Sequence, residues 1–315
     1  MNSVPVRRRA ILLMGPTGAG KSDLALRLCE SLPLEIISVD SAMVYRGLDI
    51  GTAKPGAATR ERIPHHLIDI REPPETYSAG EFTRDAALAA EDIWSRDKTP
   101  LLVGGTMLYF HALTHGLASL PQADPELRAA IDADAEREGW EAMHRRLARV
   151  DPAAAARIHV NDPQRIQRAL EVYELTGQSI SSLQQLRVSA FADANVIEIA
   201  IAPLERRDLH TSIETRFSAM LSAGLLDEVR RIRDSGAVTA EHPAMRAVGY
   251  RQLWRHLAGL CSLQEAQAQA VVATRQLAKR QFTWLRRRGN AQWFDSMHPD
   301  AASKISDALS KCDYA

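Results

Sequence analysis

Short apolar runs interrupt the chain at four places and stop at glycine, proline or acidic residues. The runs cover residues 9–14, 34–40, 99–106 and 195–203. Continuous apolar runs of this length are typical of strands buried on both faces of a parallel sheet. Helical spacing lies between them, at residues 23–29 and in the amphipathic stretch 80–97. Strands that alternate with helices predict a doubly wound parallel α/β sheet.

The long interval between the third and fourth apolar runs shows helical patterns only. Asp-Pro pairs at Asp124, Asp151 and Asp162 begin its segments, as expected for an N-cap followed by proline at the first helical position. We therefore predict a helical insertion domain at residues 121–189. The core is then formed by residues 1–120 and 190–315. After Pro203 the pattern predicts helix to the C-terminus, apart from residues 235–250.

The sequence GPTGAGKS lies between the first apolar run and the first helical pattern. Its glycines allow backbone N–H groups to face a phosphate, and the helix N-terminus adds positive potential. The lysine reaches the terminal phosphate, and the serine hydroxyl suits Mg²⁺ or a phosphate oxygen. We predict a site for a diphosphate or a nucleotide such as ATP, formed by Gly15, Pro16, Thr17, Gly18, Ala19, Gly20, Lys21 and Ser22.

A polar loop follows the second apolar run, at residues 40–55. It leaves the carboxyl end of a predicted central strand, where ligands of open α/β sheets bind. Its first residue, Asp40, is placed where a nucleotide hydrolase would hold Mg²⁺. The same position also suits other chemistry, and a turn or N-cap role is the structural alternative.

Composition limits the classes of protein to consider. Lys+Arg and Asp+Glu both number 39, so net charge points to no polyanionic partner. The three cysteines, Cys29, Cys261 and Cys312, form no closely spaced pair, which argues against disulfides or structural zinc and favours a reducing, cytoplasmic location. The first apolar run is far shorter than the roughly 20 residues of a membrane span, so we expect no membrane association.

Seven segments in chain order carry a more specific signal. They are GPTGAGKS, DSAMVYRGLDIGTAKP, IPHHLIDI, LLVGGTMLYF, NDPQRIQRALEVYELTG, RAVGYRQLW and TRQLAKRQFTWLRR, and with the strand before the first they cover about residues 11–287. Together they resemble the tRNA dimethylallyltransferases, also called tRNA isopentenyltransferases or IPP transferases. The resemblance implies a P-loop NTPase-like parallel sheet core with a helical insertion domain and a helical C-terminal region. The chain lacks cysteine pairs for a C-terminal zinc finger, as in the shorter bacterial form.

The resemblance implies transfer of a dimethylallyl group from dimethylallyl diphosphate to N6 of the adenosine 3′-adjacent to the anticodon. The phosphate loop would then hold a leaving diphosphate, whose charge Lys21 and Mg²⁺ stabilise, with Ser22 as the candidate metal ligand. Asp40 would take the N6 proton. Thr106 would line the reaction channel, and Arg216 would face the diphosphate. Asp40, Thr106 and Arg216 are therefore the predicted catalytic residues.

The resemblance also implies contacts with the tRNA anticodon stem-loop. The residues concerned are Asp40, Ser41, Ala42, Met43, Thr106, Arg128, Gln164, Arg165, Ile166, Gln167, Arg168, Arg246, Ala247, Val248, Gly249, Tyr250 and Arg251. Many family members carry glutamine where this chain has Met43, so a side-chain amide contact is absent there. The expected partners are tRNA and dimethylallyl diphosphate, and the chain is expected to be a monomer.

Two further groups of residues have more than one interpretation. Phe282 and Trp284 interleave with basic residues between Arg275 and Arg288; they either stack on unpaired bases or pack in the core. The adjacent His65 and His66 are metal ligands or, as we favour, hydrogen-bonded loop histidines.

Three other functions share parts of this pattern. They are prenyl transfer to free adenosine phosphates, ATP-dependent phosphorylation of a small molecule, and a non-catalytic GTPase-like RNA switch. The helical insertion and the arginine motifs favour a large RNA substrate over the first. The segment DSAMVYRGLDIGTAKP argues against the second, whose arginine-bearing lid PQRIQR could resemble. The chain has no NKxD motif for guanine recognition, which argues against the third.

Overall fold

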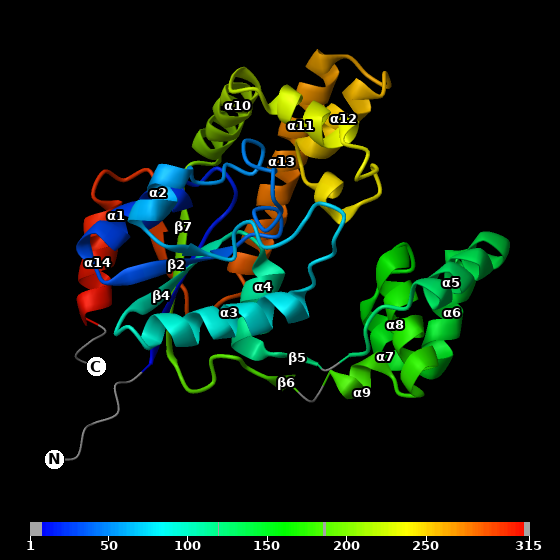
Figure 1. Ribbon diagram of the computed structural model, residues 1–315. Coiled ribbons are helices and arrows are strands. Elements are labelled where there is room, and N and C mark those ends of the chain that lie inside the picture. The colour runs from blue at the N-terminus through cyan, green and yellow to red at the C-terminus, as the bar shows by residue number, and fades with distance from the viewer. Residues whose placement is uncertain (1–7, 119, 185–186, 312–315) are drawn as a thin grey trace. The chain divides into compact units, whose positions relative to one another are not determined.

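The computed structural model describes residues 8–118, 120–184 and 187–311 (Figure 1). The chain divides into two compact units, one formed by Met1–His111 with Asp193–Ala315 and the other by Ala112–Ala192. The helical insertion domain was predicted at residues 121–189, inside the second unit. Among the described residues, no helix is long and apolar enough to cross a membrane. Cys312 lies outside the described residues.

A six-stranded parallel sheet forms the centre of the first unit, in the order β3-β2-β4-β1-β7-β8. The four predicted runs are its central strands: β1 (Arg9–Met14), β2 (Leu34–Val39), β4 (Thr99–Gly104) and β7 (Asn195–Ala202). Leu13 pairs with Val103 on one side and Ile199 on the other, so β1 is fully enclosed. The alternation of apolar runs and helices therefore predicted the sheet correctly.

The two edge strands were missed. β3 (His65–His66) has only two residues, and β8 (Gln292–Asp295) carries exposed Gln292 and Trp293, so neither shows a buried apolar run. The prediction of helix from Pro203 to the C-terminus is therefore wrong at residues 292–295. An edge strand is covered by fewer neighbours and needs fewer apolar residues.

Helices cover both faces of the sheet. α1 (Lys21–Ser31) and α14 (Ala301–Lys311) share a core with Ile11 and Leu13 of β1. Successive strand residues face opposite sides, and α3 (Ala79–Trp94), which begins with a capping box at Ser78, packs on β2 and β4. The remaining helices here are α2 (Ala57–Arg62) and α4 (Met107–His115), of which α4 reaches into the second unit.

The C-terminal helices form a second core within the first unit. They are α10 (Arg206–Ser222), α11 (Leu225–Asp234), the 3₁₀ turn η1 (Pro243–Arg246), α12 (Tyr250–Leu257) and α13 (Leu263–Leu285). Phe217, Tyr250 and Leu253 pack there against Val44 and Leu48 of the loop after β2. This core therefore supports the loop that begins with Asp40.

The second unit is a helical bundle with its own core, built on Ile131, Leu147, Ile166 and Leu170. Its helices are α5 (Pro125–Glu138), α6 (Trp140–Val150), α7 (Pro152–Arg157), α8 (Pro163–Thr176) and α9 (Ile180–Leu183). Its two-stranded sheet pairs β5 (Leu117–Ala118) with β6 (Arg187–Val188).

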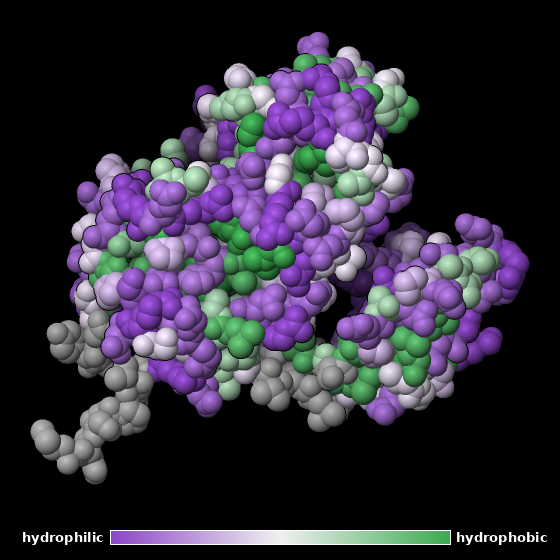
Figure 2. Space-filling model, viewed as in Figure 1, coloured by the Kyte–Doolittle hydropathy of each residue, from purple (hydrophilic) through white to green (hydrophobic). Residues whose placement is uncertain are grey.

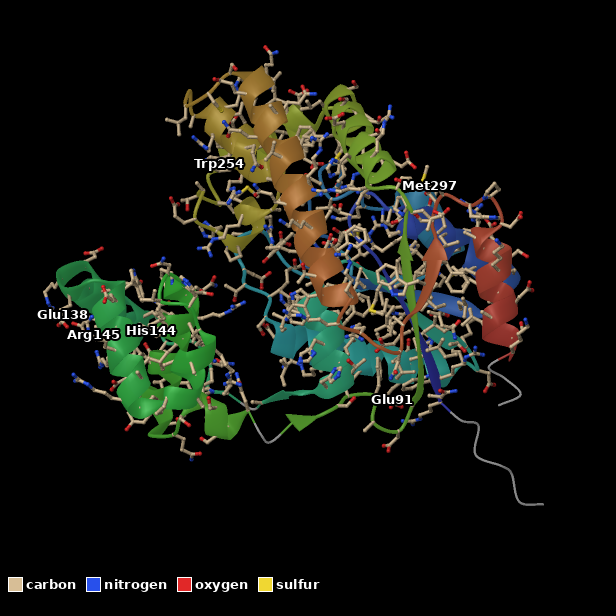
Figure 3. All side chains as sticks on the ribbon, turned by 180° about the vertical axis from the view of Figure 1, so that it is seen from behind. Glu91, Glu138, His144, Arg145, Trp254 and Met297 are labelled. Carbon is tan, nitrogen blue, oxygen red and sulfur yellow. The ribbon has the colours of Figure 1, made fainter. Side chains whose placement is uncertain are left out.

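The Asp-Pro starts predicted for these helices are confirmed. The side chains of Asp124, Asp151 and Asp162 accept hydrogen bonds from the first-turn N–H groups of α5, α7 and α8. Figure 3 shows Glu138 and Arg145 at the surface of this unit. On the face of the molecule seen in Figure 2, hydrophobic residues form small separate areas within a mostly hydrophilic surface.

Candidate active site

A cavity of about 1620 Å³ opens at the carboxyl ends of the central strands of the first unit. Its wall includes Lys21 after β1, Asp40 after β2 and Thr106 after β4, together with Arg216 of α10 and Gln281 of α13. Open parallel sheets bind their ligands at this edge. The cavity is larger than a typical small-molecule pocket, so it has room for more than one substrate group.

Glycines give the phosphate loop its shape. A Cβ on Gly15 would lie 2.5 Å from the carbonyl oxygen of Ile201 in β7. Gly18 and Gly20 adopt φ angles of +85° and +75°, which disfavour any side chain. α1 begins directly at Lys21 and its N-cap, Gly20, supplies no side-chain cap, so the first N–H groups of the helix face the loop and can bind an anion.

Lys21 is held inside this loop. Its Nζ donates to the carbonyl oxygen of Pro16 over 2.8 Å. Burial and the positive charge of Arg216 lower the pKa of Lys21 to about 7, against an opposing effect of Asp40. The ammonium form is therefore poised to gain from any negative charge that enters the loop.

Helix α10 closes the phosphate loop from a second direction. Arg216 donates from Nη2 to the Thr17 hydroxyl over 2.5 Å, and Ser212 donates to the carbonyl oxygen of Gly18 over 2.8 Å. Burial lowers the pKa of Arg216, and Asp40 counteracts part of this effect. The structure thus brings Arg216 to the predicted diphosphate site. The helical pattern of α10 alone would have left it as an exposed arginine.

Asp40 forms the turn that was the structural alternative from the sequence. Its Oδ1 accepts from the N–H of Ala42 over 2.8 Å and of Met43 over 3.2 Å, which forms a turn. No described residue donates a hydrogen bond to its Oδ2, so that oxygen is available to a substrate. Thr106 lies beside this turn, because its hydroxyl oxygen accepts from the N–H of Ser41 over 3.2 Å. The carboxylate is therefore oriented by the turn that it builds.

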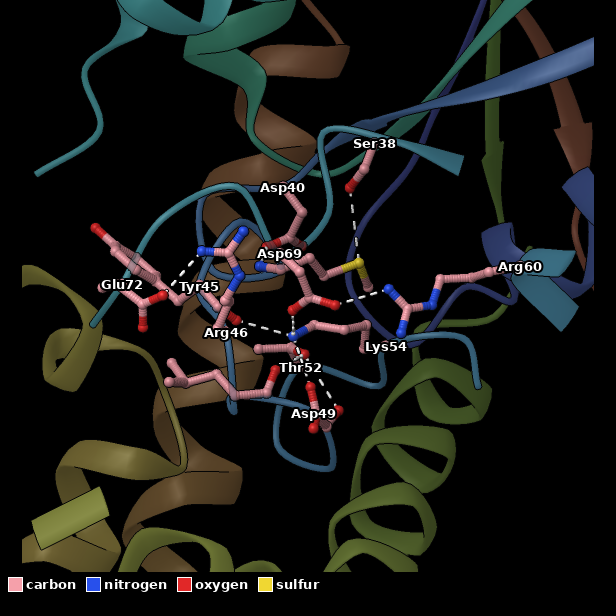
Figure 4. A network of polar contacts seen from close by, with 12 residues as sticks. Ser38, Asp40, Tyr45, Arg46, Asp49, Thr52, Lys54, Arg60, Asp69 and Glu72 are labelled. Atoms are coloured by element: carbon pink, nitrogen blue, oxygen red, sulfur yellow. Dashed lines mark hydrogen bonds and ion pairs between the residues drawn. The ribbon is translucent and has the colours of Figure 1, made fainter. Parts of the chain in front are cut away.

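A buried lysine braces the loop that follows Asp40 (Figure 4). Lys54 Nζ donates to the Tyr45 carbonyl oxygen and to the carboxylates of Asp49 and Asp69, over 2.6 to 2.8 Å. Only 2% of its side chain is exposed. Asp69 also accepts from Arg60 over 2.7 Å. Ala53 and Asp69 have positive φ angles, a strain of about 1–3 kcal/mol each that the network sustains.

A buried carboxylate holds the same loop from the C-terminal helices. Glu228 of α11 accepts from the N–H groups of Asp49, Ile50 and Gly51 and from the Tyr250 hydroxyl. Burial and the Glu228 charge raise the pKa of Tyr250, so the phenol remains a donor. A Cβ on Gly51 would lie 2.5 Å from the Tyr250 ring. The loop and the RAVGYR segment are thus fixed to each other.

Two side chains of the predicted tRNA set belong to hydrophobic cores. They are Tyr250 and Ile166, which are fully buried. A third member of the set, Met43, accepts a hydrogen bond at its sulfur from the Ser38 hydroxyl. Any RNA contact of the segments around Tyr250 and Ile166 is then made by their exposed residues. Arg246 and Arg251 are exposed in the first unit. Gln164 and Arg165 are exposed in the second unit.

Other arginines of this set have structural partners. Arg128 and Arg168 both bind the carboxylate of Glu171, which is fully buried, over 2.6 to 3.0 Å. Gln167 donates to Asp132 over 2.6 Å. These contacts hold α5 and α8 together. The tRNA role of all these positions stays a prediction.

The ambiguous residues of the sequence divide between core and cavity. Phe282 packs against the C-terminal core and stacks on Trp293, with ring centroids 6.5 Å apart. Trp284 lines the cavity, is 39% exposed and meets His111 edge to face. Core packing is therefore confirmed for Phe282, and base stacking by Trp284 stays a prediction.

The two adjacent histidines are hydrogen-bonded, as we favoured, although they lie in β3 and not in a loop. His65 pairs with the carbonyl oxygen of Ile63 over 2.7 Å, and His66 with Glu35 over 2.9 Å. Within the described residues, no group of three or more His, Cys, Asp or Glu side chains could hold a metal ion. A metal in the cavity would thus depend on substrate oxygens for most of its ligands.

Sequence reasoning gave no role to Lys54, Glu228 or Gln281. Gln281 is a buried polar residue on a face of α13 that also carries Ala278 and Leu285. A glutamine in an apolar helical stripe is the signal that could have identified it. Glu228 is recognised only from its long-range partners, because it lies 177 to 179 residues beyond the N–H groups that it binds. Lys54 is recognised from its burial and from Asp69, 15 residues further along the chain.

Comparison with known proteins gives a consistent result. A family model described as IPP transferase matches residues 43–288. A tRNA dimethylallyltransferase of Nitrosococcus oceani is 56% identical over 295 residues, which are 94% of each chain.

Solved structures agree with this match. The tRNA isopentenylpyrophosphate transferase of Bacillus halodurans is 35% identical with a TM-score of 0.71, over 97% of this chain and 96% of that one. The enzyme of Staphylococcus epidermidis is 32% identical with a TM-score of 0.69, over 97% and 100%. A eukaryotic dimethylallyltransferase described as acting on tRNA is 27% identical with a TM-score of 0.79, over 96% and 79%.

Proposed function

Because the chain belongs to the IPP transferase family, we propose that it transfers a dimethylallyl group from dimethylallyl diphosphate to N6 of the adenosine 3′-adjacent to the anticodon. Diphosphate is the other product. The chain is a tRNA-modifying prenyltransferase. The donor, the acceptor atom and the role of each residue are the parts that we propose.

One arrangement supports this reaction above all. The phosphate loop with Lys21 and Arg216 shares a single cavity with Asp40, whose Oδ2 is available, and with Thr106. An anion-binding end and a carboxylate end are what displacement of diphosphate by a weak nitrogen nucleophile requires. The cavity wall also limits the access of water to an allylic donor.

Each residue then has a definite task. The adenine leaves its stack, at a cost that is smaller in an anticodon loop than in a duplex. A bond forms between N6 and C1 of the dimethylallyl group as the bond from C1 to the diphosphate oxygen breaks. Asp40 accepts the N6 proton. Lys21, Arg216 and the loop N–H groups stabilise the charge that develops on the diphosphate.

We also propose that Mg²⁺ accompanies the diphosphate. Mg²⁺ commonly takes one or two protein ligands and binds substrate phosphates for the rest. The Ser22 hydroxyl, at the start of α1 and in the cavity wall, fits that pattern. When bound, the ion would offset charge on the leaving group. We further propose a cytoplasmic monomer whose tRNA contacts are the exposed residues of the predicted set.

Labelled dimethylallyl diphosphate, Mg²⁺ and unmodified tRNA with adenosine 3′ of the anticodon test the function, with AMP and ATP as alternative acceptors. Asn at position 40 keeps the Oδ1 that forms the turn and removes the base. We expect Asp40→Asn to lower single-turnover transfer to tRNA by at least about 100-fold. Asp92→Asn, an exposed change on α3, should have no effect.

Each alternative result has a defined meaning. Equal rates for wild type and Asp40→Asn would remove Asp40 as the base and keep the function. Label only in AMP or ATP would assign the chain to free-nucleotide prenyl transfer. Phosphoryl transfer from ATP without prenyl transfer would favour the kinase alternative.

A further inference from the structure

One buried amide connects two walls of the cavity. Gln281 lies near the C-terminal end of α13 with 7% of its surface exposed. Its Oε1 accepts from the N–H of Thr17 over 2.8 Å. Its Nε2 donates to the carbonyl oxygen of Gly105 over 2.8 Å. The side chain thus bridges the phosphate loop after β1 and the turn after β4.

The two bridged segments hold opposite ends of the reaction site. The hydroxyl of Thr17 accepts the hydrogen bond from Arg216. Gly105 precedes Thr106, whose hydroxyl oxygen accepts from the N–H of Ser41, next to Asp40. A continuous series of hydrogen bonds and adjacent residues therefore runs from the diphosphate-binding arginine to the turn of the carboxylate, and Gln281 is its midpoint.

Packing leaves little freedom at this midpoint. A Cβ on Gly105 would lie 2.4 Å from Nε2 of Gln281, so a glycine is needed for the amide to approach. The partner groups also fix the chemistry, because an N–H requires an acceptor and a carbonyl oxygen requires a donor. An amide supplies both. A carboxylate supplies only acceptors and would oppose the Gly105 carbonyl oxygen.

We propose that Gln281 is a positioning residue for prenyl transfer. It fixes the placement of the phosphate loop relative to the Asp40–Thr106 end of the cavity. The inference rests on the proposed function, because the two ends need to be aligned only if they act in one reaction. It assigns Gln281 no contact with the reacting atoms. Its loss should lower kcat at saturating substrates more than it raises KM, because the two ends are misaligned while each still binds.

Two substitutions test the bridge. Gln281→Met keeps the approximate volume and removes both hydrogen bonds. In Gln281→Glu the ionised carboxylate cannot donate to the Gly105 carbonyl oxygen. The protonated acid has one acceptor and one O–H donor, so it reproduces the hydrogen-bond pattern of the amide. We would measure single-turnover transfer to tRNA from pH 5.5 to 8.5, as the ratio of variant to wild type, so that the pH dependence of the wild-type reaction cancels.

We expect the transfer rate of Gln281→Met to be at least tenfold below that of wild type at every pH, which corresponds to about 1.4 kcal/mol. Gln281→Glu should match it at high pH and recover toward wild type as the pH falls. The exposed Gln276→Glu, on the same helix, is the control and should remain at wild-type rate throughout. Circular dichroism at each pH verifies folding.

Wild-type activity of Gln281→Met would overturn the proposal. So would a wild-type rate of Gln281→Glu at high pH, where the carboxylate cannot donate to the Gly105 carbonyl oxygen. The proposed function fails separately, if wild type transfers no dimethylallyl group to tRNA. In that case hydrogen exchange at the Thr17 amide, whose N–H donates to Gln281, still reports on the bridge. It should quicken in Gln281→Met but not in Gln276→Glu.

Discussion

Lys21 is the residue at which charge and burial conflict most sharply in the candidate site. Burial and Arg216 favour the neutral amine, and Asp40 opposes them, so that its pKa is about 7. A phosphate-loop lysine is usually regarded as a fixed positive charge. Here the charge depends on what occupies the loop, since a bound diphosphate stabilises the ammonium form.

Diphosphate binding should consequently take up a proton at Lys21. Below pH 7 the amine is already charged, so binding adds no proton. Above pH 7 the neutral amine must be protonated, so affinity falls by up to about tenfold per pH unit until the pKa of the complex is reached. Calorimetry in buffers of different ionisation enthalpy measures the uptake. At pH 8 wild type should bind about one proton more than Lys21→Met; equal uptake would contradict the assignment.

Single residues also mark the limit of sequence reasoning about the site. The phosphate loop and Asp40 stand out because local spacing and a strand end define them. Thr106 and Arg216 were identified only by resemblance, since a threonine after a strand and an arginine on a helix have many ordinary uses. Gln281 could not be paired with Thr17 beforehand, because 264 residues separate the two.

At the scale of elements, the loop 40–55 depends on supports from outside its own sequence. Asp69 braces it on one side by its ion pair with Lys54 of the loop. Glu228 of α11 binds three of its N–H groups and the Tyr250 hydroxyl. An irregular loop becomes a defined active-site wall in this way because its backbone groups find partners.

Glu228→Gln should loosen this loop. The amide NH₂ would face N–H donors that now meet a carboxylate oxygen, and we expect a loss of about 2–3 kcal/mol in unfolding free energy. Hydrogen exchange at the amides of residues 49–51 should quicken, and transfer to tRNA should slow. Asp227→Asn, exposed on the same helix, is the matched control. Unchanged exchange at residues 49–51 in Glu228→Gln would show that the contact is dispensable.

The strands were predicted where burial on both faces enforces a continuous apolar run. β1, β2, β4 and β7 meet that condition, and their observed ends differ from the predicted ones by two residues or fewer. The edge strands β3 and β8 do not, since neighbours cover them on one side only. Helix starts at Asp124, Asp151 and Asp162 were predictable because capping is a local interaction.

At the scale of the whole molecule, the two units each have their own core, and the predicted tRNA residues occur in both. We expect the exposed arginines of this set to contact tRNA phosphates. Arginines that pair with a buried carboxylate stabilise the fold. The second unit contains both kinds, since Arg165 is 71% exposed and Arg128 pairs with the buried Glu171.

Arg165→Ala should therefore affect tRNA binding, and Arg128→Ala should affect stability. Arg165→Ala should weaken tRNA binding and reduce the slope of log affinity against log salt by about 1, with thermal stability unchanged. Arg128→Ala leaves Glu171 without one of its partners and should lower the melting temperature. Filter binding at several salt concentrations and thermal unfolding separate the two effects. A lowered melting temperature in Arg165→Ala would contradict this division.

The fluorescence of Trp284 should report on what occupies the cavity. The indole lies in the cavity wall with 39% of its surface exposed, so water still reaches it. A purine base or prenyl chain that enters displaces part of this water and shifts the emission to shorter wavelength. The order in which the two substrates arrive can thus be followed by fluorescence in the unlabelled enzyme, with Trp284→Phe as the reference for the emission of the four other tryptophans.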